Sequence, residues 1–476
     1  MKPLRTIIAL LIFIFLVSSA GMSQNQGPTA RDPRIENILR DISADNIKHI
    51  VDTLAGFGTR HTASDTQSPT RGIGAARRWI KEELEKYSKE SGGRLKVEFD
   101  SFTSDPQTMD PHYRSRLPKP TELDNVVATL PGSNPDSAQR IYIVSGHYDS
   151  MCTQMNNTEC NAPGADDDAS GTAVAMELAR VMSHYSFDST LVFLCFAGEE
   201  QGLVGSKHWA DMAKEKQWVI PAVLNNDIVG NIRGGDGQLN NQTVRVFSEG
   251  VPTNETPAEK RVRESIGAEN DSSSRELARY IVQTAIKYIP DFQVQMIYRR
   301  DRYARGGDHS SFNDDGYAAI RFSEYHEDFH HQHQTPRVEG GIQYGDLPQF
   351  VYPDYIASVA RVNAASLASL ALAPSNPGHV RFGTARQAYD TVIQWEPNPE
   401  ARLAGYNVVW RETTSPVWQH SLLLGKVTEV SLKGLSKDNL IFGIQAVDKE
   451  GNASMVVIPK PPPPTRPART ANTPSQ

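Results

Sequence analysis

Cysteine is scarce in this chain, which has 476 residues and three cysteines, Cys152, Cys160 and Cys195. So few cysteines exclude a small scaffold held together by disulfides, because such scaffolds are dense in cysteine. Cys152 and Cys160 lie in one expected loop and could pair if the protein is exported. Three free thiols are the alternative. Cys195 stands in an apolar, strand-like run, which favours a buried thiol.

A strongly basic tract is also missing. Lys and Arg total 49 and Asp and Glu total 56, which gives a formal net charge of −7. Because proteins that bind nucleic acid usually carry a basic patch, we expect no nucleic-acid partner. Internal repeats are absent from the sequence as well, and nothing in it indicates an oligomeric state.

Long hydrophobic runs are confined to the N-terminus. Lys2 and Arg5 precede an apolar run at 7–17, and small residues follow at 18–20. This pattern predicts a signal peptide over residues 1–23 and export to the periplasm or the extracellular space. The run is shorter than the ~20 apolar residues that a membrane span needs, so an uncleaved anchor is the less favoured alternative. No other segment is expected to span, and we expect no stable membrane insertion.

Strand-like and helical patterns alternate over residues 24–373. Strands are expected at 95–99, 125–130, 141–144, 191–196, 222–224, 292–298 and 318–322, and helices at 35–54, 75–87, 170–183, 203–213, 276–288 and 355–372. This alternation predicts an α/β domain with helices layered on a sheet.

The composition changes after this domain. A Pro-, Ser- and Gly-containing linker at 373–378 is followed by short strand-like runs at 391–395, 405–411, 427–432 and 439–447. Such spacing predicts a small all-β sandwich over residues 374–460. The Pro- and Thr-rich residues 461–476 are expected to be disordered.

Acidic and imidazole side chains follow successive predicted strands. His147 comes after the strand at 141–144, Glu199 and Glu200 after 191–196, and Asp227 after 222–224. Ligand sites of open α/β sheets form at the carboxyl ends of the strands, so these residues should gather at one edge. Each has an ordinary alternative when taken alone: a structural histidine, a helix start or a solvated acidic loop. Their joint placement favours a metal site.

The residue types suit a hydrolase that activates water with two divalent ions. Such a site needs a bridging carboxylate, a histidine and a second carboxylate for each metal, and one further carboxylate as a base. Asp167 could bridge, His147 and His331 could supply the imidazoles, and Glu200 and Asp227 could complete the two shells.

Two carboxylates remain for other roles in this scheme. Glu199, next to Glu200, could be the general base and acid. Asp149, two residues after His147, could orient the ring of that histidine through its other nitrogen.

These motifs resemble those of the secreted co-catalytic di-zinc aminopeptidases, of which the bacterial leucyl aminopeptidases are the best-known examples. Glutamate carboxypeptidase is a more distant relative. The resemblance covers roughly residues 50–370 and rests on Gly-His-Tyr-Asp-Ser at 146–150, Gly-Ala-Asp-Asp-Asp-Ala-Ser-Gly at 164–171, Gly-Glu-Glu-Gln-Gly at 198–202, Asn-Asp-Ile-Val-Gly at 226–230 and Gly-Asp-His at 307–309.

The resemblance implies a three-layer α/β/α zinc-exopeptidase domain with a mixed central sheet and two Zn²⁺ ions. His147 and Asp227 would hold one zinc, and Glu200 and a late histidine the other. Asp167 would bridge them, because it lies 20 residues after His147 as in the family, and Glu199 would shuttle protons. The Asp167–Asp168 peptide could be cis, as in relatives.

The late histidine is the least regular part of the match. In relatives an aspartate often follows it by four residues, whereas Thr335 stands four residues after His331. Alignment on Arg337 and on Gln-Tyr-Gly-Asp-Leu-Pro at 343–348 favours His331 as the ligand. His330 is the alternative.

The resemblance implies an exported aminopeptidase acting on peptides. Alternatives are a carboxypeptidase or dipeptidase on the same scaffold, a glutaminyl cyclase, and a non-catalytic binding protein. A carboxypeptidase could use one of the arginines near the Gly-Asp-His motif for a substrate carboxylate, although a solvated basic loop also explains them: Arg299, Arg300, Arg302 and Arg305. Tyr303 could donate a hydrogen bond to a developing oxyanion.

The C-terminal domain has a resemblance of its own. Trp395, Tyr406 and the segment Phe-Gly-Ile-Gln-Ala-Val-Asp-Lys-Glu-Gly-Asn at 442–452 resemble fibronectin type III modules. In these modules the tryptophan and tyrosine pack in the core, so their role here should be structural. The module could dock on the peptidase domain or bind other surfaces.

Overall fold

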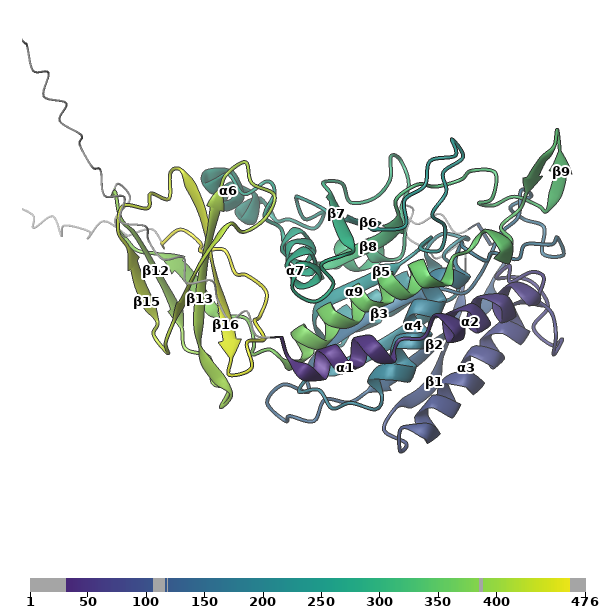
Figure 1. Ribbon diagram of the computed structural model, residues 1–476, viewed down its shortest axis with the longest axis horizontal. Helices are drawn as coiled ribbons and strands as arrows, with labels where there is room; N and C mark the ends of the chain where they lie inside the picture. The colour runs from purple at the N-terminus through teal and green to yellow at the C-terminus, as the bar shows by residue number, and fades with distance from the viewer. Residues whose placement is uncertain (1–30, 106–115, 118, 385–387, 463–476) are drawn as a thin grey trace, which may run out of the picture.

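An eight-stranded mixed sheet forms the centre of the larger domain (Figure 1). The computed structural model describes residues 31–105, 116–117, 119–384 and 388–462. The strands in spatial order are β1 (Lys96–Ser104), β2 (Thr121–Leu130), β4 (Thr190–Phe196), β3 (Arg140–His147), β5 (Val219–Asn226), β8 (Ala319–Glu324), β6 (Thr243–Phe247) and β7 (Gln293–Ile297). β3 pairs in parallel with β4 and β5, while β2 runs antiparallel to β4 and β6 antiparallel to β8.

Helices cover both faces of this sheet. One face carries α1 (Pro33–Asp41), α2 (Ala44–Gly56), α3 (Gly72–Glu90), α4 (Ala169–Met182), α7 (Ser273–Tyr288) and α9 (Pro353–Leu372); the other carries α5 (Val204–Glu215) and the short α8 (His309–Asp314). Each interface has its own apolar core. The predicted α/β class with three layers and a mixed sheet is confirmed.

The predicted helix at 35–54 is instead two helices. The chain is extended at Ile42 and Ser43, and the Ser43 hydroxyl caps α2 by accepting the backbone N–H of Asn46 at 3.2 Å. Helix α8, which was not predicted, begins within the Gly-Asp-His motif at 307–309. Short elements complete the domain: α6 (Pro257–Ile266), β9 (Arg337–Glu339), β10 (Ile342–Tyr344) and the 3₁₀ turn η1 (Pro348–Phe350).

Helix α9 is apolar around most of its circumference. By length and composition it is the one helix in the described part of the chain that could cross a membrane, a length that the sequence pattern had not indicated. However, 89% of its most apolar stretch is buried inside the fold. A helix buried on all sides in a large domain needs this composition.

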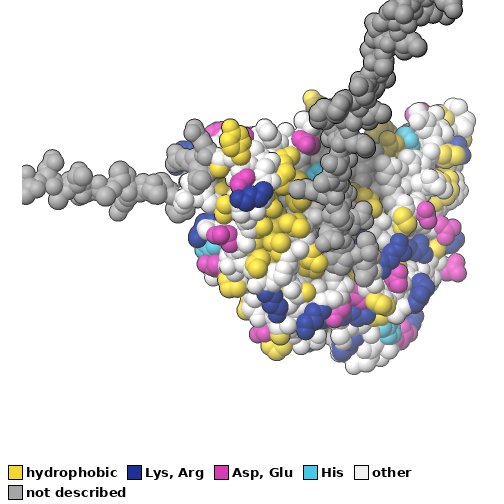
Figure 2. All heavy atoms as spheres, turned by 60° about the vertical axis from the view of Figure 1, so that its left-hand side comes forward, with side chains coloured by type: hydrophobic (Ala, Val, Ile, Leu, Met, Phe, Trp, Pro, Cys, Tyr) yellow, Lys and Arg dark blue, Asp and Glu magenta, His cyan; other side chains and the backbone are white. Residues whose placement is uncertain are grey.

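Two three-stranded sheets form the smaller domain. β11 (Gly378–Phe382), β12 (Thr391–Glu396) and β15 (Glu429–Leu432) make one, and β14 (His420–Leu424), β13 (Leu403–Glu412) and β16 (Leu440–Asp448) make the other. Trp395 and Tyr406 lie in the core between them, with ring centroids 5.2 Å apart. Figure 2 turns the side of the molecule that carries this smaller domain toward the viewer. On this face, hydrophobic side chains gather between scattered charged groups.

Buried polar contacts join the small domain to the large one. Arg140 at the start of β3 pairs with Glu400 through Nη1 and Oε1 at 3.2 Å, and both side chains are buried. Trp418 donates from its indole Nε1 to Glu276 on α7 at 3.0 Å. The sandwich is therefore docked on the larger domain. The predicted signal peptide at 1–23 lies outside the described residues, and so does the predicted tail at 461–476 except for its first two residues.

Candidate metal centre

The carboxyl ends of three neighbouring parallel strands meet at one edge of the sheet. His147 is the last residue of β3, Glu199 and Glu200 follow β4, and Asp227 follows β5. Because β3 lies between β4 and β5, their side chains come together as predicted from the sequence.

His147, Glu199 and Asp227 form a first group of metal-ligand types. His147 Nε2 lies 3.9 Å from Asp227 Oδ1 and 4.0 Å from Glu199 Oε2. Its other nitrogen, Nδ1, lies 3.2 Å from the backbone oxygen of Asp149 and 3.4 Å from Oδ1 of the same residue. An Nδ1–H that donates to Asp149 leaves the Nε2 lone pair facing the acidic groups.

Asp167, Glu200 and His333 form a second group. His333 Nε2 lies 2.9 Å from Asp167 Oδ2 and 3.0 Å from Glu200 Oε1. Asp167 Oδ1 is 3.2 Å from His147 Nε2. One oxygen of Asp167 therefore faces each group, which is the arrangement that a bridging carboxylate needs.

The prediction that His331 completes the second group is wrong. The His331 ring stacks on Phe350, with centroids 3.8 Å apart, and its Nε2 lies 3.9 Å from Asp328 Oδ2. His330, the alternative, pairs with Asp328 through Nδ1 at 2.7 Å. Successive tight turns over 328–334 and a left-handed backbone at His333 (φ 54°) bring that third histidine into the site instead.

The two outer aspartates of the triplet, Asp166 and Asp168, accept backbone N–H groups and belong to neither ligand group. Asp168 Oδ2 accepts the N–H of His147 at 3.0 Å, and its Oδ1 accepts those of Gly171 and Ile228. A Cβ on Gly171 would lie 2.1 Å from the Asn226 carbonyl oxygen, so only glycine permits this approach of α4 to β5. The Asp167–Asp168 peptide is cis, as expected.

Asp346 supports the bridging aspartate from behind, and sequence reasoning missed it. Its two oxygens accept the backbone N–H groups of Asp166 and Asp167, each at 2.8 Å. Asp166 in turn accepts the N–H of Gly230 at 2.7 Å, and burial raises its pKa to about 7. Asp346 is part of the family-like motif at 343–348, and its presence in that motif was the one sequence signal for a role in the site.

Asp149 connects the first histidine to the glutamate pair. Its Oδ1 accepts the N–H of Glu199 at 3.2 Å, and its Oδ2 accepts that of Glu200 at 3.1 Å. One buried carboxylate thus orients the imidazole and both glutamates, which goes beyond the single contact predicted from the sequence.

Arg321 is a second residue that the sequence did not reveal. This fully buried arginine on β8 donates from Nη2 to Asp227 Oδ1 at 2.8 Å and lies 3.3 Å from Asp301 Oδ2. An arginine in the middle of a strand carries no sequence signature for such a role. Its charge fixes the orientation of Asp227 and offsets part of that carboxylate's negative charge.

The donor set fits zinc. Ligands at about 2.0–2.2 Å from a tetrahedral zinc lie roughly 3.2–3.6 Å apart, and the separations of 2.9–4.0 Å within the two groups lie on either side of this range. Among the described residues, the buried atom His147 Nε2 has no hydrogen-bond partner. Burial raises the pKa of Glu199 and of Glu200, and neighbouring carboxylates add to this, so a bound cation would relieve the repulsion among these carboxylates.

A cleft of about 480 Å³ opens onto both groups. Glu199 has 14% of its side chain exposed there, whereas Glu200 has 3%. Met151, Met155 and Leu203 form an apolar part of the lining, and Arg116, Arg302 and Arg305 form a basic part. Tyr303, a predicted oxyanion donor, is 83% exposed and does not belong to the described lining.

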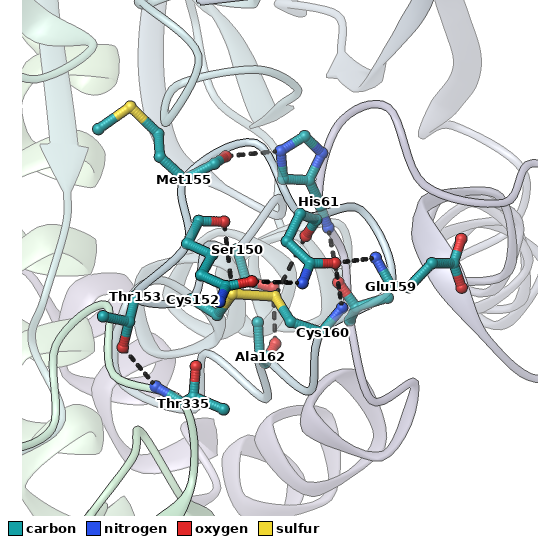
Figure 3. Close-up of a disulfide and its surroundings, with 12 residues drawn as sticks. His61, Ser150, Cys152, Thr153, Met155, Glu159, Cys160, Ala162 and Thr335 are labelled. Carbon is teal, nitrogen blue, oxygen red and sulfur yellow. Dashed lines mark hydrogen bonds between the residues drawn. A yellow bond between two sulfur atoms is a disulfide. The ribbon is translucent and has the colours of Figure 1, made fainter.

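The two methionines of the lining lie on or beside a loop closed by the disulfide Cys152–Cys160 (Figure 3). The pairing of these cysteines is confirmed, and Cys195 is buried as expected. His61 Nε2 contacts the Met155 carbonyl oxygen at 3.0 Å, and Thr153 Oγ1 accepts the N–H of Thr335 at 3.0 Å. The disulfide loop therefore contacts the segment that carries His333.

Comparison with known proteins agrees with this site. The model of peptidase family M28 matches residues 125–339, a range that includes both groups. A probable zinc metalloprotease of Leptosphaeria maculans is 44% identical over 432 residues, which cover 91% of this chain and 98% of that protein. A probable zinc metalloprotease of Pyrenophora tritici-repentis is also 44% identical, over 91% of this chain and 88% of its own.

Among solved structures, the LapA aminopeptidase of Legionella pneumophila has a similar fold. Its TM-score is 0.51 at 20% sequence identity, with 72% of this chain and 76% of that chain covered. Identity over nearly the whole length of the fungal relatives carries the assignment: this chain belongs to peptidase family M28, and the family membership makes it a zinc metallopeptidase.

Proposed function

We propose that this protein is an exported aminopeptidase that removes N-terminal residues from peptides with the help of two zinc ions. The observation that carries the proposal is the position of Asp167 between the two ligand groups, with Oδ1 3.2 Å from His147 Nε2 and Oδ2 2.9 Å from His333 Nε2. The fold likeness to the LapA aminopeptidase supports cleavage at the N-terminus.

His147 and Asp227 of the first group would hold one zinc together with Asp167, and Asp167, Glu200 and His333 would hold the other, while Glu199 would stay off the metals. Two ions bound there would lower the pKa of water and polarise the scissile carbonyl. Asp149 and Arg321 would keep His147 and Asp227 in place, and Asp346 would keep Asp167 in place.

Glu199 is the residue that we assign to proton transfer. It lines the cleft and is more exposed than Glu200, which lies 3.0 Å from His333. Burial raises the pKa of the Glu199 carboxyl, and this suits a group that takes a proton from water and returns it to the leaving amine.

Export is supported by two observations. The N-terminal pattern at 1–23 has the charge, length and small residues of a signal peptide. The disulfide Cys152–Cys160 suits an oxidising compartment such as the periplasm or the extracellular space.

We assign the small domain to the fibronectin type III class, on the two aromatic residues Trp395 and Tyr406 in its core. Its buried contacts with α7 and β3 favour a structural role against the peptidase domain.

The test is hydrolysis of a matched peptide pair by the purified protein, one peptide with a free N-terminus and one acetylated. We expect release of the first residue from the free peptide only. Cleavage of both at the C-terminal bond, and its loss when the C-terminus is amidated, would instead establish a carboxypeptidase.

A further inference from the structure

The cleft over the metal centre has a basic side that the proposed chemistry does not use. Of the four arginines at 299–305, only Arg302 and Arg305 belong to the described lining. Arg300 is turned to Asp314, with Nη2 and Oδ1 2.6 Å apart, and Arg299 lies over the exposed ring of Tyr303 at 5.6 Å. Within this loop, Arg302 and Arg305 therefore line the cleft, whereas Arg299 and Arg300 contact other side chains.

Positive charge is in excess around these two side chains. Arg302 Nη1 lies 3.1 Å and Arg305 Nη1 3.6 Å from the same oxygen, Glu327 Oε2. Arg245 Nη2 pairs with the other oxygen of Glu327 at 2.6 Å. One carboxylate is thus shared by three guanidinium groups, and Asp301 is shared by Arg302 and Arg321 in the same way.

Arg305 keeps most of its donors available. A guanidinium has five N–H donors. Among the described residues, that of Arg305 makes one hydrogen bond, from Nη1 to Gln332 Oε1 at 3.4 Å. Its side chain is 34% exposed, whereas that of Arg302 is 10% exposed and held by Asp301 and Glu327. Arg302 supplies fixed charge, and Arg305 supplies donors that can turn to a ligand.

We propose that Arg302 and Arg305 form a subsite for a substrate carboxylate, so that the preferred substrates are short peptides with a carboxylate next to the scissile bond. The carboxylate is either the free C-terminus of a dipeptide or the side chain of Asp or Glu. A planar carboxylate matches the guanidinium fork of arginine. The inference rests on the proposed peptidase activity.

The rest of the cleft agrees with such a substrate. A volume of about 480 Å³ is at the small end of the range for ligand sites, so it holds only the residues next to the scissile bond. Met151, Met155 and Leu203 offer an apolar wall to an uncharged side chain. Leucyl dipeptides are therefore suitable probes.

The experiment compares kcat/KM for Leu-Ala and Leu-Ala-amide, and for Leu-Asp-amide and Leu-Asn-amide, all with free N-termini. A charge-assisted hydrogen bond predicts that the carboxylate form of a pair is preferred on the order of tenfold to a hundredfold, mainly through KM. A preference in the first pair identifies the C-terminal carboxylate, and one in the second pair identifies the acidic side chain.

Arg305→Gln should abolish this preference and leave kcat/KM of the amide substrates nearly unchanged. Arg299→Gln is the matched control, because it removes the same charge from the same loop but outside the described lining. It should keep the preference. Equal rates for acid and amide in both pairs, or a preference that survives Arg305→Gln, would overturn the subsite.

These outcomes are separable from those for the proposed function. Hydrolysis of all four substrates without discrimination leaves the aminopeptidase standing and removes the subsite. Hydrolysis of acetyl-Leu-Ala at a rate equal to that of Leu-Ala removes the aminopeptidase assignment. An unchanged melting temperature of Arg305→Gln shows that a lost preference does not come from unfolding.

Discussion

Replacement of Asp271 by asparagine should strongly destabilise the whole protein. Asp271, Glu276, Arg279 and Arg411 form a network at the interface between the two domains, and each side chain is at most 4% exposed. Asp271 lies 3.0 Å from Arg279 Nη1 and also contacts the Arg411 guanidinium, which comes from the sandwich. The network holds two acids and two bases, so its charge is balanced.

The variant Asp271→Asn leaves two buried guanidinium groups with one carboxylate between them. Removing one partner of a buried ion pair costs about 3–5 kcal/mol, since the remaining charge stays desolvated without compensation. The double variant that adds Arg411→Met restores the balance, because Glu276 and Arg279 remain as a pair. We therefore expect the double variant to be more stable than Asp271→Asn alone.

Urea unfolding followed by tryptophan fluorescence and circular dichroism measures both effects. Because the network joins the domains, the two probes should give one coincident transition for the native protein. Lys433→Met, which removes an exposed ion pair with Asp390 on the sandwich, is the control and should cause no measurable change. A shift for Asp271→Asn no larger than this control, or additive losses in the double variant, would refute the reasoning.

Three further predictions concern single side chains. Glu199→Gln should keep both zinc ions and lower kcat by about 10²–10⁴-fold, since only the base is lost; unchanged kcat would disprove the assigned role. His333→Ala should lose zinc and activity while His331→Ala keeps both, which metal analysis of the two purified variants checks. Burial raises the pKa of Glu249 from 4.5 to about 7 despite nearby Arg300, so its stabilising contribution is full below pH 4.5 and is lost as the pH rises through 7. Relative to the native protein, Glu249→Gln should therefore gain about 3 kcal/mol in free energy of unfolding between pH 4 and pH 9, and a constant difference would contradict this.

The part of the site that lies on strands could be predicted from the sequence. His147, Glu199, Glu200 and Asp227 each follow a short apolar run, and parallel strands place their carboxyl ends at one edge. The local hydrophobic pattern and the general topology of parallel sheets are sufficient to predict where these residues lie. The same reasoning located most helices and strands of the larger domain.

The last ligand could not be placed in this way. His333 lies in an irregular segment whose course depends on distant contacts, among them the bond from Thr335 N–H to Thr153 and that from Gly345 N–H to the His330 carbonyl oxygen. No periodicity in the sequence reports such contacts. Arg321 and Asp346 were missed for the same reason, because their partners come from other parts of the chain.

Strand β6 and helix α6 are among the elements that were not predicted. Strand β6 has only five residues, and its place beside β8 depends on long-range pairing. Helix α6 has a capping box from Thr256 to Glu259 and Pro257 in its first turn, yet it buries none of its residues. Without an apolar face it showed no helical periodicity, although its start signals were present.

The account depends on a two-zinc centre in which Asp167 is shared and His333 is the last ligand. The most direct test is anomalous X-ray diffraction at the zinc absorption edge from crystals of the purified protein. We predict two peaks, one among His147, Asp167 and Asp227 and the other among Asp167, Glu200 and His333. A single peak, or a second peak beside His331, would contradict the account.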